Sequence, residues 1–264
     1  MIDTQTAMPA ITRRRRPVQW RRAWTALRRL IAHPEETEQV FELIVAIEGR
    51  SGDRLYHRFL QHPDGRRLLA ERTSLLATLS DLDTLAAMPA GSFGRAYAEF
   101  MASERLTADG LVAASRVPVE GRDDDAAPER RWFGDRMRDM HDLWHVLTGY
   151  GRDEAGEAAN LAFTLGQTRN RGVLVIVLTA ALIGPKRAWL GWQRYLYRAW
   201  RRGRRAAWLP VARFEELLPR PLESVRRALA IQPALAAHPE GVVVANRADG
   251  GTEPGDWVVE EARR

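Results

Sequence analysis

The sequence predicts an all-α fold, a single-domain helical bundle with a metal site on a helix pair. Apolar residues recur three and four positions apart through most of the 264 residues, which is the spacing of one helix face. Long stretches lack the alternation of a half-buried strand. Apolar residues make up 45% of the chain, nine of them Trp, and this content is ample for one large core.

The chain opens with an arginine-rich segment, residues 1–34. Arg13 to Arg16 precede apolar residues at near-helical spacing, and further arginines fall largely on the other side. The apolar positions are Val18, Trp20, Trp24, Leu27, Leu30 and Ile31. This pattern predicts a basic amphipathic helix. Such a helix either lies on an anionic membrane surface or packs its Trp stripe on the core.

Residues 35–232 are predicted to form a series of helices that carries the metal motif. Their apolar faces fall within 40–47, 55–60, 75–82, 97–100, 161–182, 189–200, 214–218 and 225–229. The apolar run from Gly172 to Gly184 is too short to span a bilayer and predicts a buried helix. The Trp189 to Trp200 stripe predicts a core-facing helix, with the lining of a pocket for a flat apolar ligand as the alternative.

Two segments are predicted to lack long helices. Gly121 to Glu129 contains an Asp run and a Pro, and it is the best internal loop. In residues 233–264, Pro, Gly, Ala and charged residues dominate. We expect a loosely ordered tail there, apart from the apolar run Val242 to Val244.

Composition excludes several kinds of site. Cysteine is absent, so disulfides, thiolate zinc sites, iron-sulfur clusters and cysteine nucleophiles are excluded. The net charge is +6, almost entirely from arginine because Lys186 is the single lysine. No nucleic-acid-binding signature accompanies this charge, so we expect no nucleic-acid partner. No export signal follows the first arginines, and a cytoplasmic protein is the simplest expectation.

Metal-binding side chains concentrate at His141, Asp142, His145 and Glu157. On a helix, two His four residues apart lie on one face and can direct nitrogens at one ion. Asp142 is close enough to complete the site or to hold a bound water. Glycines at 149 and 151 let the chain turn back, so a second helix from about residue 153 brings Glu157 toward the histidines.

Other interpretations of this motif stay open. The two histidines can simply be hydrogen-bonded on a surface. Proteolysis is disfavoured, because Asp142 stands where a His-Glu-x-x-His metalloprotease has the longer Glu. A His-Asp metal phosphohydrolase needs further His and Asp ligands on other helices. Four histidines remain, at 33, 57, 62 and 238, and three of them lie near Pro or in loops.

With these residues aligned, the chain resembles the Coq-four family of ubiquinone (coenzyme Q) biosynthesis proteins. The family signature His-Asp-x-x-His, eleven residues and Glu is met by His141, Asp142, His145 and Glu157. Arg138-Asp139 and Leu147-Thr148-Gly149 also look like the family. Two longer blocks agree, Met88 to Met101 and Gly203 to Ile231.

The resemblance implies an all-helical fold and a divalent metal held by these four residues. Zinc is the first choice, with iron, manganese or cobalt as alternatives. It implies the inner face of the bacterial cytoplasmic membrane, an anionic surface to which the protein binds peripherally. The implied partners are a polyprenylated quinone precursor and other ubiquinone biosynthesis enzymes, and a homodimer stays open.

Two roles follow from the resemblance. One is an enzyme that removes the ring carboxylate of a 4-hydroxybenzoate-type precursor at C1 and hydroxylates that carbon. The other is a noncatalytic, lipid-binding scaffold for a ubiquinone biosynthesis complex. We favour the enzyme. Arg138, one turn before His141, either contacts the substrate carboxylate or pairs with a neighbouring acid such as Asp142.

Overall fold

The structure, a computed structural model, describes residues 18–32, 37–104, 127–184, 189–238, 242–245 and 257–260. They form the predicted all-α fold, with one short β-hairpin near the C-terminal end. Arg13 to Arg16 and most of the predicted loop from Gly121 to Glu129 lie outside the described residues. The predicted domain boundaries after residues 34 and 232 stay a prediction.

Helices occupy most of the described chain. The first group comprises α1 (Trp20–Ala32), α2 (Thr37–Glu48), α3 (Ser51–Gln61), α4 (Pro63–Glu71), α5 (Leu75–Ser80), α6 (Leu82–Ala86) and α7 (Phe93–Ser103). The second comprises α9 (Pro128–Asp139), α10 (His141–Thr148), α11 (Glu154–Thr168), α12 (Arg171–Ile183), α13 (Trp189–Arg205), the 3₁₀ helix η2 (Leu209–Val211), α14 (Phe214–Leu217), α15 (Leu222–Ala228) and α16 (Ala234–Ala237). Strands β1 (Val242–Ala245) and β2 (Trp257–Glu260) pair antiparallel.

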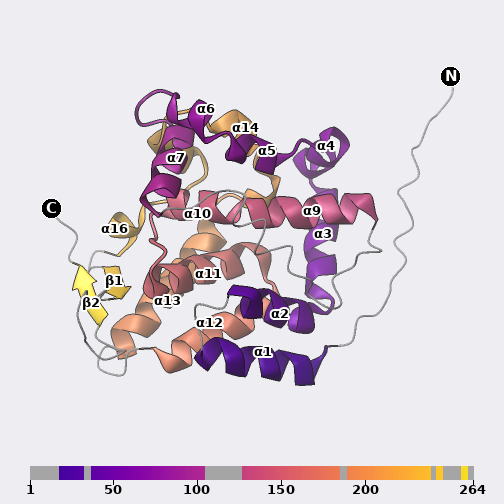
Figure 1. Cartoon of the computed structure of the whole chain (residues 1–264), viewed down its shortest axis with the longest axis vertical. Coiled ribbons are helices and arrows are strands. Elements are labelled where there is room, and N and C mark those ends of the chain that lie inside the picture. Colours follow the sequence, from indigo (N-terminus) through magenta and orange to yellow (C-terminus); the bar gives the residue numbers. More distant parts are fainter. Residues whose placement is uncertain are drawn as a thin grey trace.

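Helices α9 and α10 run end to end through the middle of the molecule (Figure 1). Helices α4 to α7 lie on one side of them, and α11 to α13 with α1 and α2 lie on the other. One buried cluster joins α7 and α10 to the segment from η2 to α15. A second joins α11, α12 and α13. The α10–α11 pair therefore lies between two cores, which hold it on both sides.

Helices α11 and α13 approach closely because small residues face each other. A Cβ on Gly203 would lie 2.1 Å from the carbonyl oxygen of Phe163, and one on Gly166 would lie 2.6 Å from that of Trp200. Neither distance is tolerable for a real side chain, so both positions require glycine. The stripe on α13 packs Trp192, Tyr195 and Leu196 into the core, whereas Trp189 at its start is 39% exposed, so the core-facing interpretation is confirmed for the middle of the stripe.

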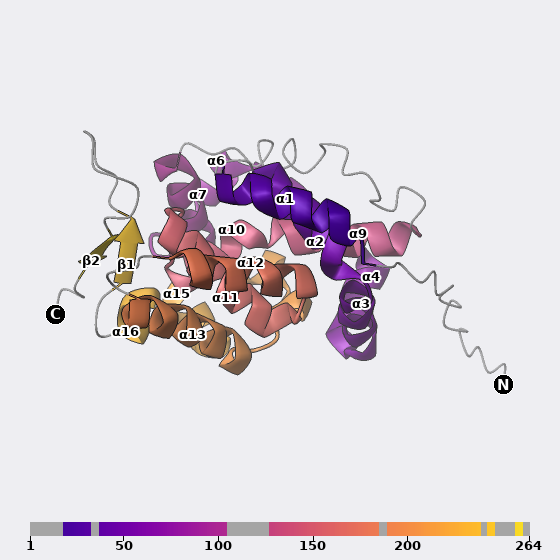
Figure 2. The ribbon, with the colours of Figure 1, turned by 90° about the horizontal axis from the view of Figure 1, so that it is seen from below.

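The prediction of a buried helix over Gly172 to Gly184 is wrong in part. Helix α12 forms there, but Leu178 is 53% and Leu182 is 72% exposed. Helix α12 packs against α2, α11 and α13, and these neighbours cover only one of its faces. Figure 2 shows α1, α12 and α13 on the same side of the molecule.

Helix α1 bears on one of the two alternatives left open for its Trp residues, the packing of these side chains on the core. Ala23 and Ala26 are buried in a cluster with residues of α2, whereas Trp20 is 71% and Trp24 is 63% exposed. Packing of these two Trp side chains on the described core is therefore excluded. None of the helices in the described ranges combines the length and apolar character needed to cross a bilayer.

The predicted loose tail contains more structure than expected. Helix α16 precedes a hairpin in which Val243 lies opposite Val259. Strand β1 coincides with the predicted apolar run, and it packs beside α11 and α13. Strand β2 is not predicted from the sequence, because a four-residue strand gains its order from a partner that is remote in the chain.

Candidate metal centre

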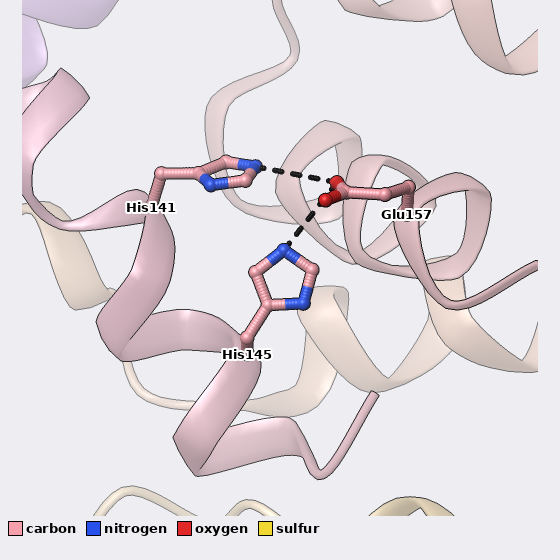
Figure 3. Close-up of side chains that lie close together, drawn as sticks. All are labelled: His141, His145 and Glu157. Carbon is pink, nitrogen blue, oxygen red and sulfur yellow. Dashed lines mark ion pairs between the residues drawn. The ribbon is translucent and has the colours of Figure 1, made fainter. Parts of the chain in front are cut away.

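Helix α10 places His141 and His145 one turn apart, with both rings directed at Glu157 of α11 (Figure 3). The Nε2 atoms of His141 and His145 lie 3.8 and 3.4 Å from Oε2 of Glu157. The ligand atoms of the three residues all lie within 4.8 Å of one another. Donors about 2.1 Å from a tetrahedral ion are about 3.4 Å apart. The spacing therefore needs only small side-chain movements to hold an ion.

The turn between α10 and α11 explains how Glu157 reaches the histidines. Gly149 adopts a left-handed conformation with φ 74° and donates its N–H to the carbonyl oxygen of His145, which ends α10. Asp153 caps α11 by accepting hydrogen bonds from the N–H groups of Ala155 and Gly156. Glu157 thus occupies the first turn of α11, on the side facing α10.

The Nδ1 atoms of both histidines have other partners. Nδ1 of His141 lies 3.2 Å from Oδ1 of Asp142, and Nδ1 of His145 lies 3.1 Å from the carbonyl oxygen of Tyr150. Each acceptor favours a proton on Nδ1 and leaves Nε2 free to bind a metal. Figure 3 shows both Nε2 atoms facing the carboxylate. This is the arrangement expected of metal-binding histidines.

Asp142, expected as a ligand or as a holder of water, stands outside the group of three in the described residues. Its carboxylate is buried and orients His141. A carboxylate behind a ligating imidazole raises the basicity of the ring. The structure thus brings together three of the four predicted ligand residues and gives the fourth a supporting contact. Its role as a direct ligand stays a prediction.

Charges at the centre favour a cation. Burial raises the pKa of Glu157, but the neighbouring side chains of His145, His141 and Arg152 outweigh burial and lower it to about 2. Burial lowers the pKa of His141, yet Asp142 and Glu157 together raise it. Without a metal, the centre therefore holds an ionised carboxylate that attracts positive charge.

The donor set fits a divalent metal. Nε2 of His145 is buried and has no hydrogen-bond partner among the described residues, and leaving a buried polar atom unpaired is costly. A metal ion would satisfy it. Two imidazole nitrogens and a carboxylate oxygen suit zinc, iron, manganese or cobalt.

Arg138 and Arg152 flank the metal motif in the sequence, and only Arg138 was predicted to contact the substrate. Arg138 forms ion pairs with Asp135 at 2.9 Å and Asp139 at 2.8 Å. Arg152 instead contacts the centre directly, with its Nε 3.2 Å from Oε1 of Glu157. The sequence did offer a signal for Arg152, because this residue follows the glycines at 149 and 151 and stands just before the helix that carries Glu157. The substrate-binding role of Arg138 stays a prediction.

Comparisons with known proteins agree in pointing to one family. The family model described as coenzyme Q (ubiquinone) biosynthesis protein Coq4 matches residues 19–234. The mitochondrial ubiquinone biosynthesis protein COQ4 of Yarrowia lipolytica is 34% identical over 183 residues, which are 68% of this chain and 66% of that protein. The corresponding Bos taurus homologue is 31% identical over 211 residues, covering 76% of this chain and 74% of its own length.

Other alignments span less of the relative. The Xenopus tropicalis homologue is 34% identical over 134 residues, 51% of this chain and 44% of that protein. A crystal structure from Nostoc punctiforme superposes with a TM-score of 0.61 at 20% identity, covering 81% of this chain and 98% of that one. That likeness shows a shared fold.

Proposed function

The chain belongs to the Coq4 family of coenzyme Q (ubiquinone) biosynthesis proteins, and from this premise we propose a metal-dependent oxidative decarboxylation as its reaction. The substrate is a polyprenylated 4-hydroxybenzoate-type precursor, which loses its C1 carboxylate and gains a hydroxyl at the same carbon. The supporting observation is the convergence of both Nε2 atoms and the Glu157 carboxylate, with each Nδ1 engaged behind the site.

His141, His145 and Glu157 would hold the ion, and Asp142 would orient His141. When bound, a divalent cation supplies a Lewis acid that draws electron density from a carboxylate. Zinc is the first choice for this donor set, with iron, manganese and cobalt as alternatives. Phe100 stacks on His145 with ring centroids 5.8 Å apart, so an apolar surface borders the site.

The substrate carboxylate needs a positive contact besides the metal. Arg152 stands beside Glu157, and a guanidinium binds a carboxylate through two parallel hydrogen bonds. We assign the binding of the substrate carboxylate to Arg152 in addition to Arg138. The guanidinium of Arg138 already forms ion pairs with two aspartates. Loss of CO₂ with hydroxylation at C1 is a two-electron oxidation of the ring. The proposed external oxidant is molecular oxygen, which takes up the two electrons and two protons to give hydrogen peroxide, while water supplies the hydroxyl oxygen.

The exposed apolar side chains support a peripheral membrane location. Trp20 and Trp24 of α1 and Leu178 and Leu182 of α12 are all more than half exposed, and the two helices lie next to each other (Figure 2). Trp beside arginines suits the headgroup region of an anionic bilayer. We propose the inner face of the bacterial cytoplasmic membrane as the location and other ubiquinone biosynthesis enzymes as partners. A homodimer stays open.

The same surface favours the second candidate, a noncatalytic lipid-binding scaffold whose metal is structural. The two roles differ in what removal of the metal does. A structural metal contributes its binding free energy to folding, so a chelator would unfold a scaffold. An enzyme would stay folded and lose turnover.

The test combines metal content with turnover. We expect wild-type protein to hold stoichiometric metal and to convert a prenylated hydroxybenzoate in aerobic buffer. His145→Ala, which removes the most buried ligand, should lose both while circular dichroism shows a retained helical fold. Metal without turnover would favour the scaffold. A wild type without metal would refute the site itself.

A further inference from the structure

The turn after α10 influences which ring nitrogen of His145 carries a proton and which one is free to bind a metal. The carbonyl oxygen of Tyr150 can only accept a hydrogen bond, and it lies 3.1 Å from Nδ1 of His145. A proton on Nδ1 leaves the lone pair on Nε2, the atom that faces Glu157. The position of the Tyr150 backbone therefore selects the ring tautomer that binds metal.

The side chain of Tyr150 is itself anchored by the C-terminal segment. Its hydroxyl lies 2.7 Å from Nε2 of His238, and both residues are buried. The hydroxyl and Nε2 share one hydrogen bond, and the tautomer of His238 decides which of them donates. Arg202 also lies over the Tyr150 ring at 4.9 Å and donates to the carbonyl oxygen of Thr148.

Backbone packing brings His238 to this turn. A Cβ on Gly149 would lie 3.2 Å from the N atom of Ala234, so the segment rests directly on the glycine that ends α10. The N–H of His238 donates to the carbonyl oxygen of Ala234 at 2.9 Å, which folds the ring back toward Tyr150. His238 lies beyond residues 19–234, the part matched by the family model.

We propose that His238 is a positioning residue for the metal centre: through the Tyr150 hydroxyl it fixes the turn whose carbonyl oxygen orients His145. The inference rests on the proposed metal site. His238 is the outermost of three residues linked by two contacts, one from His238 to the Tyr150 hydroxyl and one from the Tyr150 carbonyl oxygen to the His145 ring.

The chain offers a matched control in the same buried cluster. Tyr195 also packs against the His238 ring, with centroids 4.6 Å apart. Its buried hydroxyl has no hydrogen-bond partner among the described residues. Tyr150→Phe and Tyr195→Phe each remove one buried hydroxyl from neighbouring rings. Only Tyr150→Phe removes the hydrogen bond with His238.

The experiment measures the His145 ring and metal affinity separately. In metal-free protein labelled with ¹⁵N-histidine, the wild type should show His145 as the Nδ1–H tautomer. Tyr150→Phe and His238→Leu should mix the tautomers and weaken Zn²⁺ binding about tenfold, the lower end for lost supporting contacts. Tyr195→Phe should change neither. His238→Gln, which keeps an acceptor, should restore part of the affinity.

Each outcome decides the inference. An unchanged His145 tautomer and Zn²⁺ affinity in Tyr150→Phe would overturn it, as would equal losses in both Tyr→Phe variants, because equal losses indicate general packing. Wild-type protein that binds no Zn²⁺ would refute the proposed function, while the tautomer measurement on the metal-free protein would still decide the role of His238. Thermal unfolding of each variant confirms that it is folded.

Discussion

Gly156 lies against the turn that joins α10 to α11, and a methyl group added at this position should push the start of α11 away from that turn. A Cβ there would lie 2.1 Å from the carbonyl oxygen of Gly151, whereas carbon and oxygen atoms in contact are about 3.4 Å apart. Because the obstacle is backbone, no rotamer change relieves it. In Gly156→Ala, the start of α11 must therefore move by roughly 1 Å, and the next residue, Glu157, moves with it.

The expected free-energy change combines two opposing effects. Alanine in a helix gains about 0.5–1 kcal/mol over glycine, and overpacking costs about 1–3 kcal/mol. We expect a net loss of about 1–2 kcal/mol, which lowers Tm by roughly 2–8 °C for a domain of this size. Displacement of Glu157 should also weaken Zn²⁺ binding on the order of 10–100-fold.

Gly134→Ala is the control, because a Cβ on this glycine of α9 meets nothing within 4 Å. It should raise Tm slightly and leave Zn²⁺ affinity unchanged. Thermal unfolding of the metal-free proteins and Zn²⁺ titration measure the two quantities. If Gly156→Ala matches the wild type in both, the close approach of α11 to the turn does not position Glu157, and the reasoning fails.

Two further predictions concern a buried ion pair and the exposed Trp residues. Burial raises the pKa of Glu215, but Arg136 outweighs it and lowers the pKa, so the pair stabilises the fold above the ordinary Glu pKa and is lost as pH falls through the folded value. Glu215→Gln leaves the buried Arg136 without this ion-pair partner, and it should lower the free energy of unfolding, measured with urea at pH 7, by about 3–5 kcal/mol. The loss of stability as the pH falls should also become smaller than in the wild type. A cost below about 1 kcal/mol would contradict this prediction. Replacing Trp20 and Trp24 with Ala should weaken binding to anionic vesicles by about tenfold or more without lowering Tm. The control is Leu235→Ala, which changes an exposed residue of α16. Equal weakening by this control would refute a specific membrane face.

The sequence was sufficient for contacts that are local in the chain. His141 and His145 share a helix face because of their spacing, and the glycines at 149 and 151 predicted the turn that brings Glu157 back. The contact of Asp142 with the His141 ring was not predicted, because a helix position alone does not separate a metal ligand from a partner of the neighbouring ring.

The sequence does not predict contacts between remote segments. Tyr150 and His238 are 88 residues apart, and neither stands in a recognisable motif. Likewise, the apolar residues of α12 predict burial on all sides, but burial depends on how many neighbouring helices cover the helix. Only the fold shows that one face of α12 stays exposed.

All three residues of the metal group lie within one αα-hairpin, and this has a consequence for chain entropy. His145 and Glu157 are twelve residues apart, so bringing them together in the unfolded chain closes only a short loop. With a partner as remote as His238, the same closure would cost about 1.8 kcal/mol more. A metal ion can therefore join α10 to α11 before the rest of the chain has folded around them, and the hairpin can then act as an early template on which the flanking cores assemble.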